Sequence, residues 1–201
     1  MERVVKVQNH PNSFNINQAI MTFSSFSAIC AILIIFLINT DIFSIGYFFA
    51  SKDLSKTILV TSISLLALII YGVILSALIP SEFIDDTNKT YQNYNLIQII
   101  SFMFVVSLFE ELFLRGIVQN FLLITLENAW LSIIISTLLF VALHVQYFKK
   151  PIMLLNITIP GLVFGWIYYE SSNIAVPITV HFLVNVGTTL LFKYNVIKIK
   201  P

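Results

Sequence analysis

Six polar side chains that could do chemistry lie in stretches of this chain that are otherwise apolar. Together with one phenylalanine they form three short patterns: Glu110-Glu111-x-x-x-Arg115, Phe140-x-x-x-His144 and His181-x-x-x-Asn185. Residues four apart lie on one face of a helix, so the members of each pattern are expected to face the same way. Ionisable residues in such apolar helices are costly and by default indicate a functional site. The three patterns therefore predict one shared polar pocket.

Two carboxylates and two imidazoles in a dry pocket are suited to activating water. Desolvation disfavours the charged form of both kinds of group, which favours proton transfer near neutral pH. We expect Glu110 to take a proton from a water molecule held by His144, and the resulting hydroxide to attack a peptide carbonyl. Asn185 and His181 are the expected donors to the oxyanion that forms.

Other members of the patterns have expected supporting roles. Glu111 and Arg115 are spaced i and i+4 with the acid first, the favourable order for an ion pair on one face. Arg115 is then expected to hold Glu111 ionised and oriented, and Phe140 to pack against the ring of His144. No serine or cysteine stands at helical spacing from either histidine, and Cys30 lies in a distant apolar run. A covalent nucleophile is therefore disfavoured.

The three patterns in series resemble the motifs of the CAAX-protease and bacteriocin-processing (CPBP, or Abi) intramembrane proteases, which include the type II CAAX prenyl endopeptidases. The resemblance covers about residues 95–193, and every motif position is matched in order. It implies an all-helical membrane peptidase whose catalytic centre is formed by Glu110, His144 and His181. It also implies a peptide or membrane-protein substrate, in bacteriocin or signalling-peptide processing or in self-immunity.

Two mechanisms stay open for such a centre. Zinc bound by Glu110, His144 and His181, with water in the fourth position, would be a three-ligand catalytic site. However, the HExxH spacing is absent, and ligands drawn from three helices make a weaker pattern than ligands from one helix. We therefore favour the mechanism without a metal cofactor and keep zinc as the alternative.

Two other classes of function also place Glu and His within a membrane. A proton-coupled transporter usually has a larger architecture with internal repeats, and these 201 residues show no repeat. A non-catalytic scaffold or bacteriocin immunity protein of the same fold, acting by partner binding, is the stronger alternative. Alanine at Glu110 or His144 separates the two, because only a protease loses its phenotype.

The composition indicates which elements must position these residues. Hydrophobic residues make up 58% of the chain and charged residues 10%, with a mean hydropathy of +0.90. Ordinary globular chains are about a quarter charged, so a soluble domain and a disordered chain are excluded. A net charge of +1 provides no basic surface for nucleic acid. The expected fold class is an all-α polytopic membrane protein.

Apolar stretches predict the membrane helices. A hydrocarbon core of about 30 Å takes roughly 20 apolar residues as helix, and lipid offers no partner to a free backbone group. We expect about six transmembrane helices in one bundle with a polar intramembrane pocket, at residues 19–38, 57–79, 96–126, 129–148, 152–169 and 174–192. A helix over 96–126 is about 46 Å long, so it must tilt or break, and Gly116 is the candidate position.

The chain is expected to form a single membrane domain with three parts. Residues 1–94 hold a tail and the first two helices, 95–193 the catalytic helices, and 194–201 a basic tail. Gly161 and Gly165, in the sequence GLVFG, form a small-xxx-small face. Such a face serves either a homodimer or close packing inside the bundle, and we favour the second.

Cationic residues outside the spans predict the orientation, because cytoplasmic loops are richer in Lys and Arg. Nine lysines against two arginines, with abundant Ile, Asn and Phe, are typical of an AT-rich bacterial genome. With the amino terminus inside, the outer loops hold only two cations, Lys52 and Lys56. The inner segments then hold eight: Arg3, Lys6, Lys89, Lys149, Lys150, Lys193, Lys198 and Lys200. We expect a multi-pass protein of the bacterial cell membrane with both termini cytoplasmic and the cavity open to that side.

Overall fold

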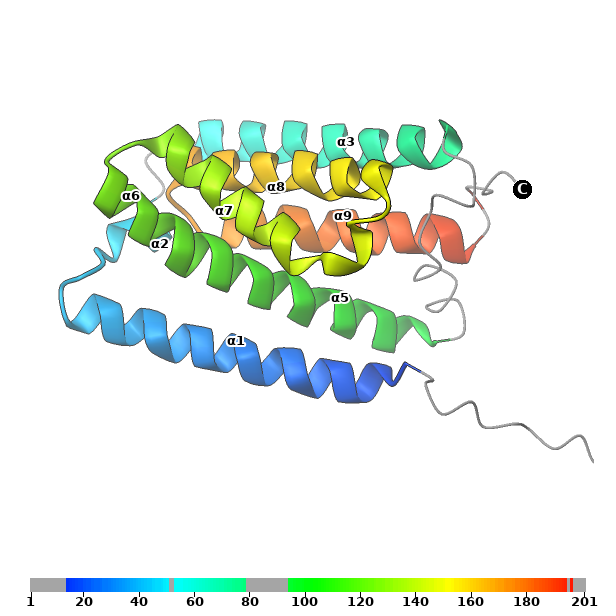
Figure 1. Cartoon of the computed structure of the whole chain (residues 1–201), viewed down its shortest axis with the longest axis horizontal. Helices are drawn as coiled ribbons and strands as arrows, with labels where there is room; N and C mark the ends of the chain where they lie inside the picture. Colours follow the sequence, from blue (N-terminus) through cyan, green and yellow to red (C-terminus); the bar gives the residue numbers. More distant parts are fainter. Residues whose placement is uncertain (1–13, 51–52, 79–93, 195, 197–201) are drawn as a thin grey trace, which may run out of the picture.

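A computed structural model of the chain describes residues 14–50, 53–78, 94–194 and 196. Its long helices run side by side and form one bundle (Figure 1). The predicted all-α fold is confirmed. Across the described residues, extended pairing is limited to one isolated bridge between Phe49 and Asn173.

Among the described residues, five helices are long and apolar enough to cross a membrane. They are α1 (Ile16–Asn39), α3 (Leu54–Leu78), the continuous helix Leu96–Leu126, α8 (Pro151–Ser171) and α9 (Ala175–Lys193). The continuous helix consists of α5 (Leu96–Glu111), the π-helix η2 (Leu112–Gln119) and α6 (Asn120–Leu126). The short elements are α2 (Gly46–Phe49) and the 3-10 helix η3 (Val145–Tyr147). The chain is a membrane protein, and each of these five helices matches a predicted span to within a few residues.

The predicted span 129–148 is wrong at its end. The helix there, α7, covers Ala129–Leu143, and its 15 residues reach only about 22 Å, short of the hydrocarbon thickness. The chain then turns through η3 before α8 begins, and this connection stops short of the ends of α3, α5 and α9 (Figure 1). Irregular backbone at membrane depth is tolerated where it lines a cavity.

Asparagine side chains begin three of the helices. Asn15 and Asn128 accept hydrogen bonds from backbone N–H groups three residues on, at 3.1 and 3.0 Å. Asn95 forms a capping box with Gln98. Each cap satisfies backbone donors that the helix leaves unpaired and contributes about 1 kcal/mol, so these helix ends are marked in the sequence itself.

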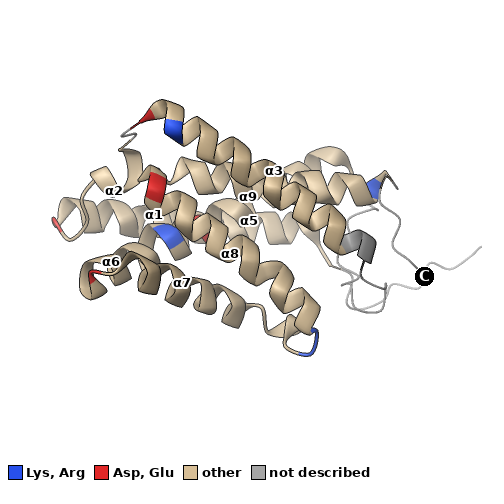
Figure 2. Ribbon diagram, turned by 90° about the horizontal axis from the view of Figure 1, so that it is seen from above, with Lys and Arg blue, Asp and Glu red and all other residues tan. Residues whose placement is uncertain are grey.

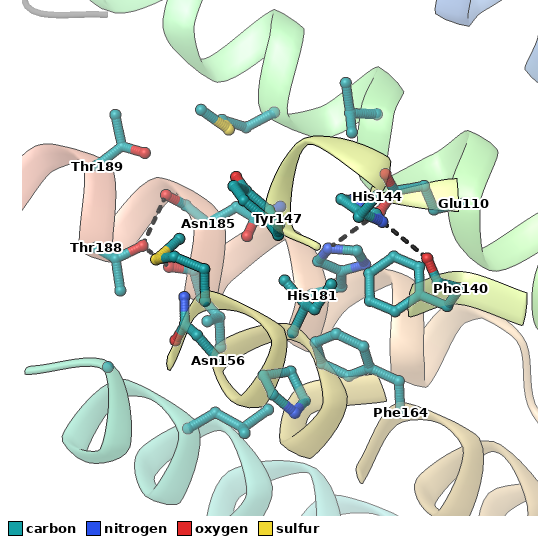
Figure 3. Close-up of a pocket in the computed structure, with 18 of the residues that line it drawn as sticks. Glu110, Phe140, His144, Tyr147, Asn156, Phe164, His181, Asn185, Thr188 and Thr189 are labelled. Atoms are coloured by element: carbon teal, nitrogen blue, oxygen red, sulfur yellow. Dashed lines mark hydrogen bonds and ion pairs between the residues drawn. The ribbon is translucent and has the colours of Figure 1, made fainter. Parts of the chain in front are cut away.

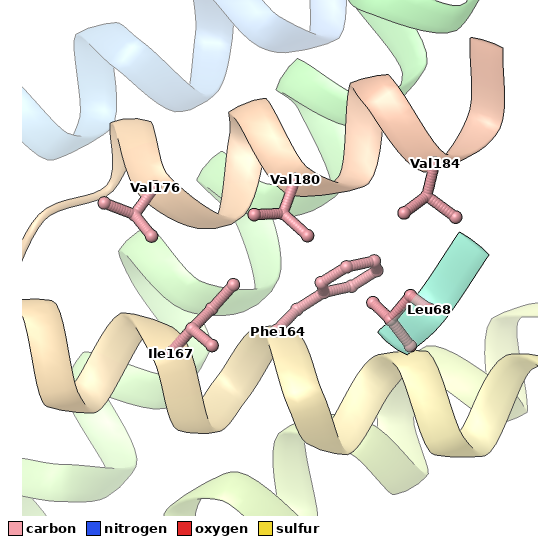
Figure 4. Close-up of a cluster of buried hydrophobic side chains, with 6 residues drawn as sticks. All are labelled: Leu68, Phe164, Ile167, Val176, Val180 and Val184. Carbon is pink, nitrogen blue, oxygen red and sulfur yellow. The ribbon is translucent and has the colours of Figure 1, made fainter. Parts of the chain in front are cut away.

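The core next to the site lies between α3, α8 and α9 (Figure 4). Val176, Val180 and Val184 follow one another at intervals of four along α9 and face Phe164 of α8. The whole buried cluster comprises Leu68, Phe164, Ile167, Val176, Val180 and Val184. This packing holds α9 against α8 along the length that carries His181.

The two glycines of α8 allow close packing inside the bundle. A Cβ on Gly161 would come within 2.9 Å of Thr137 Cγ2, and one on Gly165 within 3.0 Å of Ile133 Cγ2. Both neighbouring residues belong to α7. The small-xxx-small face is therefore used between α7 and α8, as favoured, and is not free for a second copy of the chain.

The segment around Gly116, the candidate position for a break, is a π-helix within the continuous helix Leu96–Leu126, so this helix is irregular there and continues through Gly116. A Cβ on Gly116 would lie 2.9 Å from Ile34 Cδ1 of α1, so α1 packs closely against η2 at this position. π-Helical turns are rare and are frequent at functional sites. Charged residues gather toward the ends of the bundle, and η2 with the end of α5 carries charge in its interior (Figure 2).

Candidate active site

One cavity brings the predicted catalytic residues together. Its volume is about 460 Å³, and Glu110, His144, His181 and Asn185 all line it. These side chains come from α5, from the end of α7 and from α9 (Figure 3). The polar pocket predicted from the three patterns is therefore present.

His181 is held on three sides. Its Nδ1 lies 2.8 Å from Glu111 Oε1, and its Nε2 lies 3.5 Å from Glu110 Oε2. Because a carboxylate accepts, Nδ1–H of His181 is the donor to Glu111. The ring stacks on Phe164 with centroids 4.5 Å apart and planes at 20°. Only 5% of His181 is exposed, so its position is determined by these neighbours.

The predicted ion pair of Glu111 with Arg115 is present and fully buried. Arg115 Nε lies 3.3 Å from Glu111 Oε2, and Nη2 donates to the carbonyl oxygen of Gly161 at 2.7 Å. The guanidinium carbon lies 5.7 Å from the ring centroids of Phe140 and Phe164, within the range of a cation–π contact. Arg115 thus fixes the carboxylate that in turn holds a histidine.

The contact between Glu111 and His181 is the part of this arrangement that the patterns did not predict. The sequence patterns indicated Glu110 as the carboxylate of the catalytic centre and predicted for Glu111 only an ion pair with Arg115. The structure places Glu111 closer to the imidazole, across 70 positions of sequence. Glu110 keeps a side chain that is 16% exposed and borders the cavity.

His144 does not lie within a helix, as the predicted span required. It is the C-cap of α7, with φ −99° and ψ 52°. Its Nδ1 lies 2.8 Å from the carbonyl oxygen of Phe140, so Nδ1–H donates and Nε2 is the acceptor of the neutral ring. The expected contact with Phe140 is present, with centroids 4.6 Å apart, and Tyr147 stacks on the imidazole at 5.9 Å.

Asn185 follows His181 by one turn and lines the same cavity. Its Nδ2 donates to Ser107 Oγ of α5 at 3.4 Å. Sequence reasoning missed Asn156 of α8, which also lines the cavity. A signal for Asn156 was present in the sequence, because it is a polar residue within the predicted apolar span 152–169. Phe164 and Tyr147 had no such signal in a chain with 18 Phe and 8 Tyr.

The three predicted zinc ligands do not form a ready metal site. No group of three or more His, Cys, Asp and Glu side chains in the described part of the chain is placed to hold a metal ion. Each nitrogen of His181 faces a carboxylate, and Nδ1 of His144 is used by a backbone carbonyl. An Nδ1–H donated to a carboxylate or a carbonyl leaves Nε2 of each histidine for another partner, so zinc stays the alternative, and we derive no chemical step through it.

A second polar network ties η2 to its neighbours beyond Arg115. Gln119 Nε2 donates to the carbonyl oxygen of Gly165 at 2.9 Å. Asn120 Nδ2 donates to the hydroxyl of Tyr168 at 2.7 Å, and that hydroxyl donates to the carbonyl oxygen of Tyr47. The bonds of Arg115 and Gln119 attach one face of η2 to the backbone of α8 at Gly161 and Gly165, and the bond of Asn120 connects the start of α6 to α8 and α2.

Comparison with known proteins identifies this part of the chain. Residues 92–187 match the family described as Type II CAAX prenyl endopeptidase Rce1-like. These residues are similar to that family. The resemblance indicated by the three patterns is thereby confirmed, and the matched range contains all three of them. It includes α5 through α8 and most of α9, whereas α1 and α3 lie outside it.

One curated relative of the chain is the "Uncharacterized protein YpbD" of Bacillus subtilis (strain 168). It is 27% identical over 109 residues, which make up 53% of this chain and 53% of YpbD. The chain thus spans about half the length of this curated relative. No solved structure matches the chain significantly.

Proposed function

We propose that the protein is an intramembrane endopeptidase that hydrolyses a peptide bond with a water molecule activated by Glu110. The observation that carries this proposal is the convergence of Glu110, His144 and His181 on one cavity within a bundle of membrane-length helices. The Rce1-like family of residues 92–187 supports a protease of the CAAX type.

The geometry suggests a role for each group. Nε2 of His144, the acceptor of the neutral ring, holds a water molecule by one proton, and Glu110 takes the other. The hydroxide attacks the peptide carbonyl, and the oxyanion receives a hydrogen bond from the Asn185 amide, beside His181. Glu110 then returns its proton to the leaving amine.

The surroundings of the two glutamates support this division of roles. Glu110 is partly exposed to the cavity, whereas Glu111 is completely buried and engaged by both Arg115 and His181. A general base must reach the water from which it takes a proton. Glu110 meets that condition, and Glu111 acts as a positioning residue for His181.

We propose further that the protein lies in the bacterial cell membrane with both termini cytoplasmic. Figure 1 shows that α1 begins and α9 ends at the same end of the bundle. The cavity lining lies in the parts of α3, α8 and α9 nearest that end, so the cavity opens toward the cytoplasm. A peptide or membrane-protein substrate fits this site, with bacteriocin or signalling-peptide processing or self-immunity as the context.

The test is cleavage of a quenched fluorescent peptide library by the full chain in detergent, with the products identified by mass spectrometry. Glu110→Gln should lower kcat about 10²- to 10⁴-fold, the usual contribution of general acid–base catalysis. Glu127→Gln, on the exposed connector before α7, is the matched control and should leave kcat unchanged. Undiminished cleavage by Glu110→Gln excludes this mechanism, and a library that stays intact with the unaltered chain favours a scaffold.

A further inference from the structure

The cavity extends well beyond the proposed catalytic groups. From Glu110 it continues along α9 toward the end of that helix, past Asn185 and Thr188 (Figure 3). Its volume of about 460 Å³ lies within the range of about 300–1,000 Å³ that is typical of ligand sites. A few residues of an extended polypeptide fit such a space.

One wall of the cavity can bind a polypeptide backbone through amide and hydroxyl groups. We name Asn156, Asn185 and Thr188, which all line the cavity, the amide strip. The Thr188 hydroxyl donates to the carbonyl oxygen of Val184 at 2.8 Å, so its oxygen remains an acceptor. The side chain of Asn156 has no hydrogen bond to any other described residue. A half-buried amide without a protein partner is suited to bind the peptide groups of a substrate.

The other walls are apolar and carry almost no charge. They include the side chains of Leu68, Leu75, Met153, Phe164 and Phe192. Glu110 is the only acidic residue among the described residues that line the cavity, and no lysine or arginine is among them. A charged substrate group next to the cleaved bond therefore lacks a compensating partner.

The free-energy cost of burying such an unpaired substrate charge determines which substrates the cavity accepts. Burying an unpaired charge is strongly unfavourable, and an acidic group is in addition repelled by Glu110. Among the described lining residues, a substrate lysine could pair only with Glu110, and this pairing would occupy the proposed general base. A free terminal carboxylate finds no lysine or arginine among the same residues, which favours cleavage of an internal bond.

We infer that the cavity selects an uncharged stretch of polypeptide on both sides of the cleaved bond, with its backbone bound by the amide strip. This inference rests on the proposed function and specifies its substrate class. It makes Asn156 and Thr188 determinants of substrate binding, and it makes the absence of lysine and arginine among the described lining residues the basis of selectivity.

The direct test uses a peptide that the full chain cleaves in detergent. Nearly isosteric replacements, Gln by Glu and Met by Lys, are made one at a time on either side of the cleaved bond. Each charged peptide should be cleaved with a kcat/KM roughly tenfold or more below that of its neutral counterpart. Equal kcat/KM values for charged and neutral peptides overturn the inference, although the protein remains a protease.

Two variants test the walls separately. Asn156→Leu should raise KM about fivefold, the effect of losing one hydrogen bond to substrate, and change kcat less. Thr158→Val in the same helix is the control, because its hydroxyl bonds only to its own helix at Leu154.

Leu75→Lys should relieve the discrimination against acidic peptides while neutral peptides are still cleaved. An unchanged KM in Asn156→Leu, or undiminished discrimination in a Leu75→Lys chain that cleaves neutral peptide, contradicts the inference.

Discussion

Two adjacent glutamates occupy different environments in this protein. Glu111 is completely buried and contacts both Arg115 and His181, while Glu110 borders the cavity. A helix turns about 100° per residue, so neighbours in sequence face different partners. At the residue scale, this turn separates a positioning group from a proposed general base.

Arg115→Met should strongly destabilise the protein, because it leaves the carboxylate of Glu111 buried without its cation. Loss of one partner of a buried pair costs about 3–5 kcal/mol, which for a chain of this size lowers the melting temperature by about 10 °C or more. Thermal unfolding in detergent measures the effect.

The control is Lys56→Met, which removes the cation of an exposed pair with Glu170 and should change the melting temperature little. The double variant Glu111→Leu with Arg115→Met should be more stable than Arg115→Met alone, because no unpaired charge remains. If Arg115→Met melts like the Lys56→Met control, the buried pair does not stabilise the bundle.

Whether peptide cleavage requires zinc is also a question at the scale of single residues. Because no group of three or more His, Cys, Asp and Glu side chains among the described residues is placed to hold a metal ion, we expect peptide cleavage to persist after chelation with EDTA. Elemental analysis of the purified chain should give much less than one zinc per chain. One zinc per chain, whose removal abolishes cleavage and whose return restores it, would show that the side chains rearrange around a metal.

At the element scale, the site is positioned by short and irregular elements rather than by regular membrane spans. The helix α7 ends at Leu143, and the recessed turn after it carries His144 and Tyr147 into the cavity lining. The approach of α8 to α7 depends on Gly161, whose added Cβ would also lie 3.2 Å from Phe140 Cδ1. The glycine contact and the imidazole are thus linked through Phe140.

Gly161→Ala should therefore reduce both stability and activity. Overpacking of a well-packed contact costs about 1–3 kcal/mol, and displacement of Phe140 disturbs the support of His144. Gly187→Ala is the matched control, because the nearest atom to its Cβ is Ile69 Cδ1 at 3.8 Å. We expect the melting temperature and kcat to fall in Gly161→Ala only. Equal behaviour of the two variants would mean that α7 and α8 separate without cost.

At the scale of the whole molecule, the two ends of the bundle differ. The cavity lies toward the end where α1 begins and α9 ends (Figure 1). Glu127, with the left-handed φ of 50°, lies in the connector between α6 and α7 toward the opposite end. These two ends allow the proposed orientation to be measured.

A cysteine placed at Gln146, which lines the cavity, should react with a membrane-impermeant maleimide in inverted vesicles and not in intact cells. A cysteine at Glu127 should show the reverse. Both are made in a Cys30→Ser background, which removes the natural cysteine. Labelling of the Gln146→Cys chain from outside intact cells would contradict a cavity that opens to the cytoplasm.

The sequence by itself determined the class of the protein, five of its membrane helices and the polar residues of the three patterns that line its pocket. Those features are readable because hydropathy and membrane thickness act locally along the chain, and because polar residues such as Glu110 and Asn185 are costly in apolar helices. The family resemblance was readable for the same reason, since its motifs are short and local.

Only the tertiary structure decided how these residues pair. The bond from His181 to Glu111 joins positions 70 apart, and its existence depends on how α9 and α5 approach each other. The end of α7 at Leu143 also depends on packing, because the hydrophobic pattern continues past that residue while the chain turns into the cavity. Contacts between helices depend on close-packed shape, which hydropathy does not encode.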